Sequence, residues 1–310
     1  MSRMHEKVTM AICTYNRASM LPALVDAIRK QECSITFDTL FINNNSTDNT
    51  EEILRNVAIA QGPDIRYVNE KQQGIVFARN RAIEECRDSE YLLFIDDDEI
   101  PRPGILQAAV DALQAGYDCV GGRVTVKLPD NKRPGWLKDN LLGFLAEVDY
   151  GDKEFQIKDA STPVWTANIA YRTALFDDGL KFSLRYNRQG KGVGGGSDLV
   201  MFNELLKRKV KMMYCPDMIV DHYVEPWRLK RSYFIKLHFT SGFKSGKWEL
   251  EEFDKTLFGV PPFLFSQAAK HLLKTAVMYL SLRPNRLRQA MNSAHALGLI
   301  AGQYSRSKEK

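Results

Sequence analysis

Apolar runs alternate with amphipathic stretches along the first 126 residues. Continuous apolar runs of this length suit strands that are covered on both faces. Such runs occupy residues 8–13, 37–42, 65–68, 91–95 and 119–126. The stretches between them carry apolar side chains at helical spacing, over residues 20–31, from 49 or 50 onward, 74–87 and 103–115. The alternation predicts an α/β fold, Rossmann-like, with a mostly parallel sheet and flanking helices.

The regular pattern stops in the middle of the chain. Residues 127–159 are irregular, and five glycines lie between residues 186 and 198. That glycine stretch is typical either of a mobile lid or of a surface loop. Asp198 then begins an amphipathic helix, where a carboxylate is also explained by helix capping. Residues 212–220 read as an edge strand because they contain Pro216.

Four consecutive acids, Asp96, Asp97, Asp98 and Glu99, follow the apolar run at 91–95. Packing carboxylates at the end of a buried strand is costly unless a positive group neutralises them. Alternate side chains of an extended chain share a side, so Asp96 and Asp98 can converge. Converging carboxylates with no nearby Cys or His favour Mg²⁺ or Mn²⁺ over zinc. The alternative is a solvated acidic turn.

Polar residues also follow the first two apolar runs. Thr14, Tyr15, Asn16 and Arg17 come after the first, and residues 43–48 (NNNSTD) after the second. No GxGxxG motif follows the first run, so the fingerprint of a dinucleotide dehydrogenase is missing. Short amides and hydroxyls can read a base and a ribose by hydrogen bonds, but they are equally common in turns.

Two further side chains carry alternative interpretations. Trp165, in the stretch PVWTAN, can stack on a sugar face or belong to the core. His222, directly after the strand predicted at 212–220, is either a structural histidine or a metal ligand beside the acids.

Charge divides the chain into two parts. Residues 1–226 carry 28 Lys and Arg against 33 Asp and Glu, whereas residues 227–310 carry 15 against 5. A basic C-terminal part indicates an anionic surface as partner. The five cysteines are scattered without a CxxC pair. We therefore expect neither disulfides nor a zinc site, and the N-terminus shows no apolar core of a secretory signal.

Several motifs, taken in order over residues 7–245, resemble the inverting glycosyltransferases of family 2, which have the GT-A fold. These motifs are TYNR after the first strand, NNNSTDNT, Gly74 with the Ala-Arg-Asn that ends at Asn80, IDDDEIP, the loop ending at Asp198, and Asp221-His222. The segment after His222 is similar to bacterial members that build cell-surface polysaccharides.

The resemblance implies a role for each matching residue. Asp98 matches the direct metal ligand of the DxD motif, with Asp96 or Asp97 near the ribose, and His222 matches a late histidine that helps to hold the metal. Asp198 matches the general base. Trp165 and Asn168 fall where the acceptor is contacted, and the remaining donor-binding positions are Thr14, Tyr15, Asn16, Arg17, Asn44, Gly74 and Arg79.

The expected reaction follows from this resemblance. A sugar would move from a nucleotide-sugar donor to a glycan or lipid-linked acceptor in a single displacement with inversion, assisted by Mg²⁺ or Mn²⁺. Asn43 and Asn44 stand where the family commonly carries acids that contact uracil, and Ser197 replaces a usual Glu. An Asn amide can still pair with a uracil edge, so UDP remains the favoured nucleotide.

The resemblance divides the chain at residue 245. We expect a catalytic domain at 1–245, with a nucleotide-binding half at 1–126 and an acceptor half at 127–245. Residues 246–310 then form a basic, amphipathic helical segment. This segment either lies on a membrane surface or packs on the catalytic body or a second subunit. The expected location is the cytoplasm, at the inner face of the cytoplasmic membrane, with no nucleic-acid partner.

Two other functions compete with this interpretation. A nucleotidyltransferase also uses metal-bound acids on an α/β sheet, but a basic glycine-rich loop would usually follow its first strand, and TYNR is not such a loop. A membrane-surface binding protein with a degenerate site is the non-enzyme alternative. The acids, Asp198 and the glycine stretch, all present together, argue against it.

Overall fold

The computed structural model describes residues 6–190 and 192–309. These residues form two compact units. Unit 1 covers residues 6–190 and 197–225, and unit 2 covers residues 192–196 and 226–309. Each unit has its own packing and is described separately.

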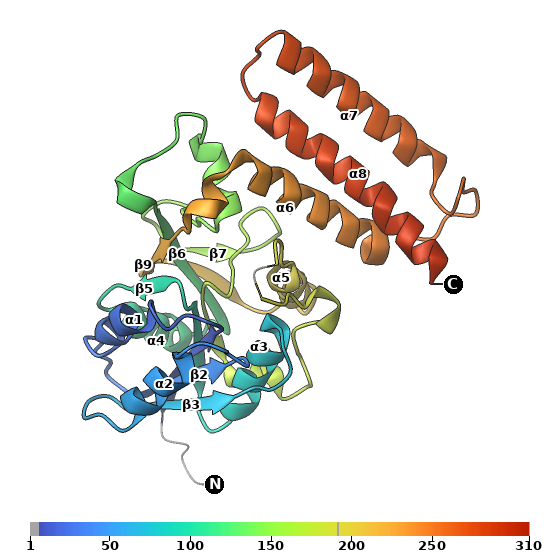
Figure 1. The fold of residues 1–310 in the computed structure, drawn as a ribbon. Coiled ribbons are helices and arrows are strands. Elements are labelled where there is room, and N and C mark those ends of the chain that lie inside the picture. Colours follow the sequence, from blue (N-terminus) through green and yellow to red (C-terminus); the bar gives the residue numbers. More distant parts are fainter. Residues whose placement is uncertain (1–5, 191, 310) are drawn as a thin grey trace. The chain divides into compact units, whose positions relative to one another are not determined.

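Unit 1 is built on one sheet whose nine strands all lie within the described residues (Figure 1). The order is β3-β2-β1-β4-β8-β6-β9-β5, and β7 also pairs with β9. The first four strands in this order are parallel to one another, as the alternating pattern predicts. Beyond them β8 is antiparallel to both β4 and β6, so the sheet is mixed. The strands are β1 (Lys7–Thr14), β2 (Thr36–Asn43), β3 (Ile65–Asn69), β4 (Tyr91–Asp96), β5 (Glu99–Pro101), β6 (Cys119–Lys127), β7 (Phe155–Ile157), β8 (Asn168–Arg172) and β9 (Met212–Tyr223).

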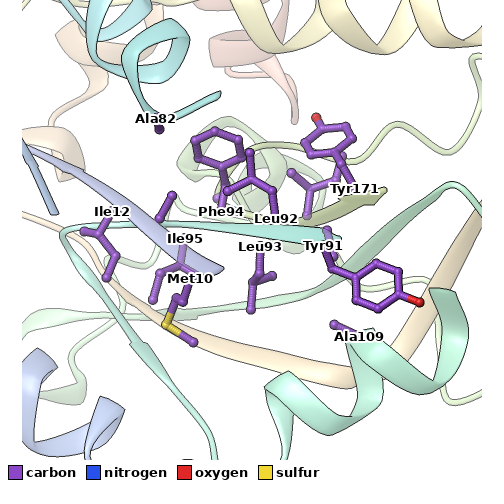
Figure 2. Close-up of a cluster of buried hydrophobic side chains, with 14 of the residues drawn as sticks. Met10, Ile12, Ala82, Tyr91, Leu92, Leu93, Phe94, Ile95, Ala109 and Tyr171 are labelled. Atoms are coloured by element: carbon purple, nitrogen blue, oxygen red, sulfur yellow. The ribbon is translucent and has the colours of Figure 1, made fainter. Parts of the chain in front are cut away.

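Helices cover both faces of the sheet around β4. In Figure 2, Leu92 and Phe94 point toward Ala82 of α3, whereas Leu93 points toward Ala109 of α4. All the apolar side chains of β4 are at most 2% exposed, which explains why its sequence is uniformly apolar rather than alternating. The helices of unit 1 are α1 (Leu21–Ile28), α2 (Thr50–Ala58), α3 (Ile75–Glu85), α4 (Ile105–Gln114) and α5 (Ser197–Lys207).

Strand β9 lies inside the sheet, so the prediction of an edge strand is wrong. It pairs with β6 on one side and with β5 and β7 on the other. Pro216 is tolerated because the β6–β9 register shifts there: Cys215 pairs with Gly122, and the next pair is Ile219 with Arg123. A bulge needs no ladder hydrogen bond from the proline nitrogen.

The α-helices of unit 2 are α6 (Arg231–Lys244), which continues into a π-helical turn at Ser245–Glu249, α7 (Pro262–Leu280) and α8 (Arg286–Lys308). A 3₁₀ turn at Pro226–Leu229 precedes α6. Within this unit α8 packs against both α6 and α7 (Figure 1). Where α6 and α8 meet, the contact is between backbones. A Cβ on Gly242 would lie 2.1 Å from the His295 carbonyl oxygen, and one on Gly298 would lie 2.2 Å from that of Phe239. Glycine is therefore required at both positions.

This packing explains why the compact units divide at residues 225 and 226 and not at the expected residue 245. Helix α6 precedes residue 245 in sequence, but its closest partner is α8. Residues 192–196 of the glycine stretch also belong to unit 2, where the Lys244 ammonium group donates a hydrogen bond to the Gly194 carbonyl at 3.3 Å. Over the described parts of the chain, no helix is both long and apolar enough to cross a membrane.

Candidate active site

The acidic corner, Asp96–Glu99, lies where β4 ends and β5 begins. Strand β5 pairs antiparallel with β9, so that Glu99 faces His222 in the register. The Tyr223 amide also donates to the Asp98 carbonyl at 2.9 Å. This pairing brings the His222 Nδ1 atom to 3.3 Å from Asp98 Oδ1 and 3.7 Å from Glu99 Oε1. The structure thus brings the two predicted metal ligands together.

Burial makes the ionised form of this corner unfavourable. It raises the pKa of Asp97 to about 7, although the neighbouring Arg17 guanidinium opposes the rise. Burial and the adjacent carboxylates also raise the pKa of Asp96 and place that of Glu99 well above its usual range. The Glu99 carboxylate additionally accepts a hydrogen bond from the Asp96 amide at 2.8 Å. More positive charge would favour full ionisation of these acids.

Arg17 supplies part of that positive charge. Its Nε atom donates to Asp97 at 3.2 Å, and its Nη2 atom lies 3.4 Å from Asp98. The third nitrogen, Nη1, donates to Glu225 at 3.2 Å. The predicted donor-binding arginine therefore contacts the acids themselves in this structure. The Tyr15 amide completes the contact with a 3.3 Å hydrogen bond to Asp97.

The two polar loops predicted after β1 and β2 are bonded to each other. The Asn16 carboxamide oxygen accepts from the Thr47 amide at 2.7 Å, and the Asn16 amide donates to Ser46 Oγ at 3.0 Å. Asn16 adopts φ +53°, a left-handed conformation that asparagine tolerates better than most residues. The Arg17 amide donates to Thr50 Oγ1 at 2.9 Å. Thr14, the last residue of β1, is buried at the start of this arrangement.

Asn44 has both ends of its carboxamide engaged by the loop before α3. Its oxygen accepts from the Gly74 amide at 2.7 Å, and its nitrogen donates to the Gln72 carbonyl at 2.7 Å. Gly74 has φ +136°, and a Cβ there would lie 2.1 Å from the Asn187 side chain. The structure gives Asn44 a loop-bracing contact, and its predicted contact with uracil stays a prediction.

Arg79 links the acidic corner to Asp198. This arginine is only 6% exposed and lies on α3, with Nη1 at 2.9 Å from Asp198 and Nη2 at 3.6 Å from Asp96. Nη1 also donates to Ser197 Oγ at 3.0 Å. Arg79, predicted to bind the donor, therefore bridges Asp96, which the resemblance places near the donor, and Asp198, which it makes the general base.

Asp198 stands in the first turn of α5, as predicted, and its Oδ1 atom accepts hydrogen bonds from Arg79 and from the Thr166 hydroxyl. Burial raises the pKa of Asp198, but Arg79 and Thr166 outweigh burial, so the net pKa lies below its usual value. The carboxylate is therefore ionised at neutral pH and able to accept a proton. The ion pair also weakens its basicity.

The two predicted acceptor residues occupy different environments. Trp165 is half-buried and packs against the edge of the core. Asn168 is 1% exposed, and its Nδ2 atom donates to the carbonyls of Arg123 at 3.0 Å and Met218 at 2.8 Å. Asn168 thus braces three strands of the sheet. The remaining oxygen is itself buried, so this conformation offers no Asn168 atom to an acceptor, and the predicted contact stays a prediction.

The site contains residues that the sequence-based reasoning missed. Glu225 lies 208 positions from its partner Arg17, and Asn187 lies 111 positions from Val76, whose amide donates to it at 3.1 Å. No local pattern signals such distant partners. Thr166 could have been predicted as a site residue, because it stands in the sequence between the predicted Trp165 and Asn168.

The residues present fit a divalent cation. Asp98 and His222 offer donor atoms 3.3 Å apart, close to the separation of about 3.0 Å between neighbouring ligands of an octahedral ion with bonds of about 2.1 Å. Burial is the main cause of the raised pKa values of Asp96, Asp97 and Glu99, and a bound cation would favour the ionised form of these acids. Among residues 6–190 and 192–309, no three His, Cys, Asp or Glu side chains form a metal site by themselves. Further ligands would have to come from substrate or water.

Solved structures define the class of fold. Mannosyltransferase PcManGT from Pyrobaculum calidifontis, in complex with GDP-Man and Mn²⁺, matches with a TM-score of 0.61 at 17% identity, over 96% of this chain and 87% of that chain. TarS 1-349 of S. aureus, in complex with UDP, matches with a TM-score of 0.53 at 15% identity, over 97% of this chain and 92% of that chain. These likenesses confirm the predicted GT-A fold.

The family follows from sequence. The model of glycosyl transferase family 2 matches residues 9–180, more than half of the chain. This chain belongs to glycosyl transferase family 2, as the resemblance indicated. Glycosyltransferase AglE of Haloferax volcanii is 30% identical over 125 residues, which cover 40% of this chain and 41% of that protein. A PGL/p-HBAD biosynthesis glycosyltransferase of Mycobacterium tuberculosis is 32% identical over 88 residues, 28% of this chain and 34% of that protein. Each match thus spans less than half of the relative.

Proposed function

We propose that this protein is a metal-dependent, inverting glycosyltransferase that takes its sugar from a UDP-sugar and passes it to a glycan or lipid-linked acceptor. The observation that carries the proposal is the Arg79 bridge. One buried guanidinium contacts Asp96 in the acidic corner and Asp198 at the start of α5. A donor-side acid and a candidate base are thereby held within one network.

Asp98 and His222 would hold the cation, and Asp96 or Asp97 would lie near the donor ribose. A bound Mg²⁺ or Mn²⁺ would neutralise the charge that develops on the departing nucleoside diphosphate. Arg17 already contacts Asp97 and Asp98. Binding of a donor with its cation therefore requires this guanidinium either to share the acids or to turn toward the phosphates.

Asp198 would remove the proton from the acceptor hydroxyl as that oxygen attacks the anomeric carbon. Its Oδ1 atom is already committed to Arg79 and Thr166, so the proton would go to Oδ2. Arg79 keeps the carboxylate ionised and fixes its orientation. One base and one leaving group on opposite sides of the sugar imply a single displacement with inversion.

Solved relatives support a nucleotide-sugar donor without deciding which nucleotide it carries. PcManGT holds GDP-Man and Mn²⁺, whereas GalNAc-T7 holds UDP, GalNAc and Mn²⁺ at a TM-score of 0.56 and 10% identity, over 82% of this chain and 53% of that chain. We favour UDP because Asn43 and Asn44 stand where the family commonly carries the acids that contact uracil. Asn44 is bonded to Gly74 and Gln72, so pairing with a uracil edge would require it to exchange one of these hydrogen bonds. The teichoic acid poly(glycerol phosphate) polymerase of Staphylococcus epidermidis is 27% identical over 96 residues, which cover 30% of this chain and 13% of that protein. This similarity supports a cell-surface polymer as the acceptor class.

A thermal-shift panel tests both the metal and the nucleotide. UDP, GDP and dTDP are each added with Mn²⁺ or with EDTA to the wild type, to Asp98→Asn and to the control Asp217→Asn, which removes an exposed acid from the same strand as His222. A ligand at about 100 times its Kd stabilises by about 2.7 kcal/mol, which raises Tm by roughly 5–10 °C. We expect this rise only with UDP and Mn²⁺, and only in the wild type and the control.

Other results contradict separate parts of the proposal. Stabilisation by GDP or dTDP but not by UDP overturns the choice of donor. An equal UDP effect in EDTA, or in Asp98→Asn, overturns the metal role. NMR tests the stereochemistry independently. It identifies the anomeric configuration of the sugar that is first released when the protein hydrolyses its sugar nucleotide. Release of the donor's own anomer rules out inversion.

A further inference from the structure

Helix α7 buries only a narrow strip of its surface within unit 2. Leu264 and Ala268 are buried, and His271, Thr275 and Met278 are half-buried, all at helical spacing. This strip faces α8, because Thr275 and His271 are hydrogen-bonded to Ser293 and Gln289 of that helix. Helix α7 runs beside α8 in Figure 1. The rest of the helix is exposed.

The exposed side of α7 is strongly apolar. Its apolar face consists of Phe265, Leu272, Leu273, Val277 and Leu280, which are between 36% and 87% exposed. At about 100° per residue these five side chains fall within an arc of about 140°. A soluble helix normally has one apolar stripe, which its own core covers. α7 has a second such stripe that its unit leaves uncovered.

Charge indicates what covers this face. Lys270 and Lys274 lie along one border of the apolar arc, and residues 256–308 contain seven Lys and Arg but no Asp or Glu. A second copy docked through α7 would therefore bring lysines together with no acid from this segment to pair with them. An anionic lipid surface offers acyl chains for the apolar face and phosphates for the lysines.

We propose that α7 lies in the interface of an anionic lipid bilayer, with its apolar face among the acyl chains and its two lysines at the headgroups. The sequence predicted a basic, amphipathic helical segment at residues 246–310, with a membrane surface as one of its two alternatives. The structure restricts the membrane role to one helix, because α8 has ten buried residues along its length and packs between α6 and α7. The proposal concerns binding alone and does not depend on the proposed reaction.

Vesicle flotation of the full chain tests it. Vesicles of phosphatidylcholine are compared with vesicles in which about 30% of the lipid is phosphatidylglycerol, since each basic side chain gains affinity only from anionic lipid. Leu273→Asp places a charge at the centre of the apolar face, where the side chain is 68% exposed. Ile59→Asp makes the same change at a side chain that is 82% exposed next to α2 and serves as the matched control.

We expect the wild type and Ile59→Asp to float with anionic vesicles, and Leu273→Asp to bind at least about tenfold more weakly, because it loses the burial of a whole leucine. Replacing both Lys270 and Lys274 with Gln should weaken binding by about fivefold for each lysine. Helical content by circular dichroism and Tm should stay unchanged in each variant, since the substituted side chains are exposed.

Three results overturn the proposal. The first is a wild type that never floats, and the second is equal binding of Leu273→Asp and Ile59→Asp. The third is equal binding to neutral and anionic vesicles, which removes the role of the lysines. Sedimentation without lipid identifies the competing occupant: a dimer that Leu273→Asp dissociates would assign the apolar face to a second copy of the chain.

Discussion

Replacing Asp198 with Asn separates the two roles that the structure gives to this carboxylate. Asn keeps an oxygen that can accept hydrogen bonds from Arg79 and Thr166, and it caps a helix about as well as Asp. It cannot accept a proton. If Asp198 is the general base, turnover should fall by about 100- to 10,000-fold. The affinity for UDP with Mn²⁺ should change little, because the loss is confined to the transition state.

The same substitution should also destabilise unit 1. Removing one partner of a buried ion pair costs about 3–5 kcal/mol when the other charge is left alone. In Asp198→Asn, Arg79 retains its ion pair with Asp96 at 3.6 Å, and the Asn carboxamide oxygen can still accept a hydrogen bond from the guanidinium. We therefore expect a smaller loss, about 1–3 kcal/mol, within the range of a buried charged hydrogen bond.

The pH dependence of this loss has a definite sign. The folded-state pKa of Asp198 lies below its usual value of 3.8. Its ionised form therefore contributes stability that is fully present above about pH 4 and is lost as the pH falls through the folded-state pKa. The difference in stability between wild type and Asp198→Asn should be constant near neutral pH and shrink in acid.

Turnover per folded molecule, calorimetric donor binding and urea denaturation together measure these effects. Asp178→Asn, at an exposed acid, controls for the loss of a charge. Ser197→Ala removes another partner of Arg79 but keeps the carboxylate, so it should lower stability while turnover persists. An Asp198→Asn protein that turns over within about tenfold of the wild type would refute the base assignment and leave Asp198 as the partner of Arg79.

Two predictions concern unit 2. Burial lowers the pKa of His238 and His295 below the usual 6.5, so the unfolded chain binds their protons at a higher pH than the folded chain does. The free energy of unfolding should therefore fall as the pH drops through 6.5. Denaturation measured between pH 8 and 5 should show a weaker pH dependence in His295→Gln, and an unchanged pH dependence would contradict the assignment. Gly298→Ala places a Cβ against the Phe239 backbone and should cost about 1–3 kcal/mol or more. The matched Gly143→Ala, where a Cβ meets no atom within 4 Å, should cost little, and equal losses would disprove the backbone contact.

Local pattern alone determined the main strands and helices of the first 126 residues, but it did not predict β5 or β7. An apolar run such as that of β4 can be stable only as a strand covered on both faces, and the helices beside it follow from apolar spacing. The strand–helix alternation then leaves few arrangements other than a parallel sheet, and the acids after β4 necessarily lie at its carboxyl edge. Asp98 could be expected near His222 because the sequence placed both just after predicted strands. Strand β9 in fact continues through His222 to Tyr223, and its pairing with β5 makes the contact.

Only the tertiary structure decided which side chains are partners. Arg79 reads from sequence as an arginine on a helix, and its bridge between Asp96 and Asp198 depends on residues 17 and 119 positions away. The edge-strand prediction for residues 212–220 was wrong, and the bracing hydrogen bonds of Asn168 were not predicted. Both depend on β6 and β9, which are distant from each other in sequence. Residue 245 was expected as a boundary, yet the glycines of α6 and α8 extend the packing of unit 2 across it. Hydrophobic period specifies which face of an element is buried, but the identity of the neighbour on that face emerges only when the whole chain is packed.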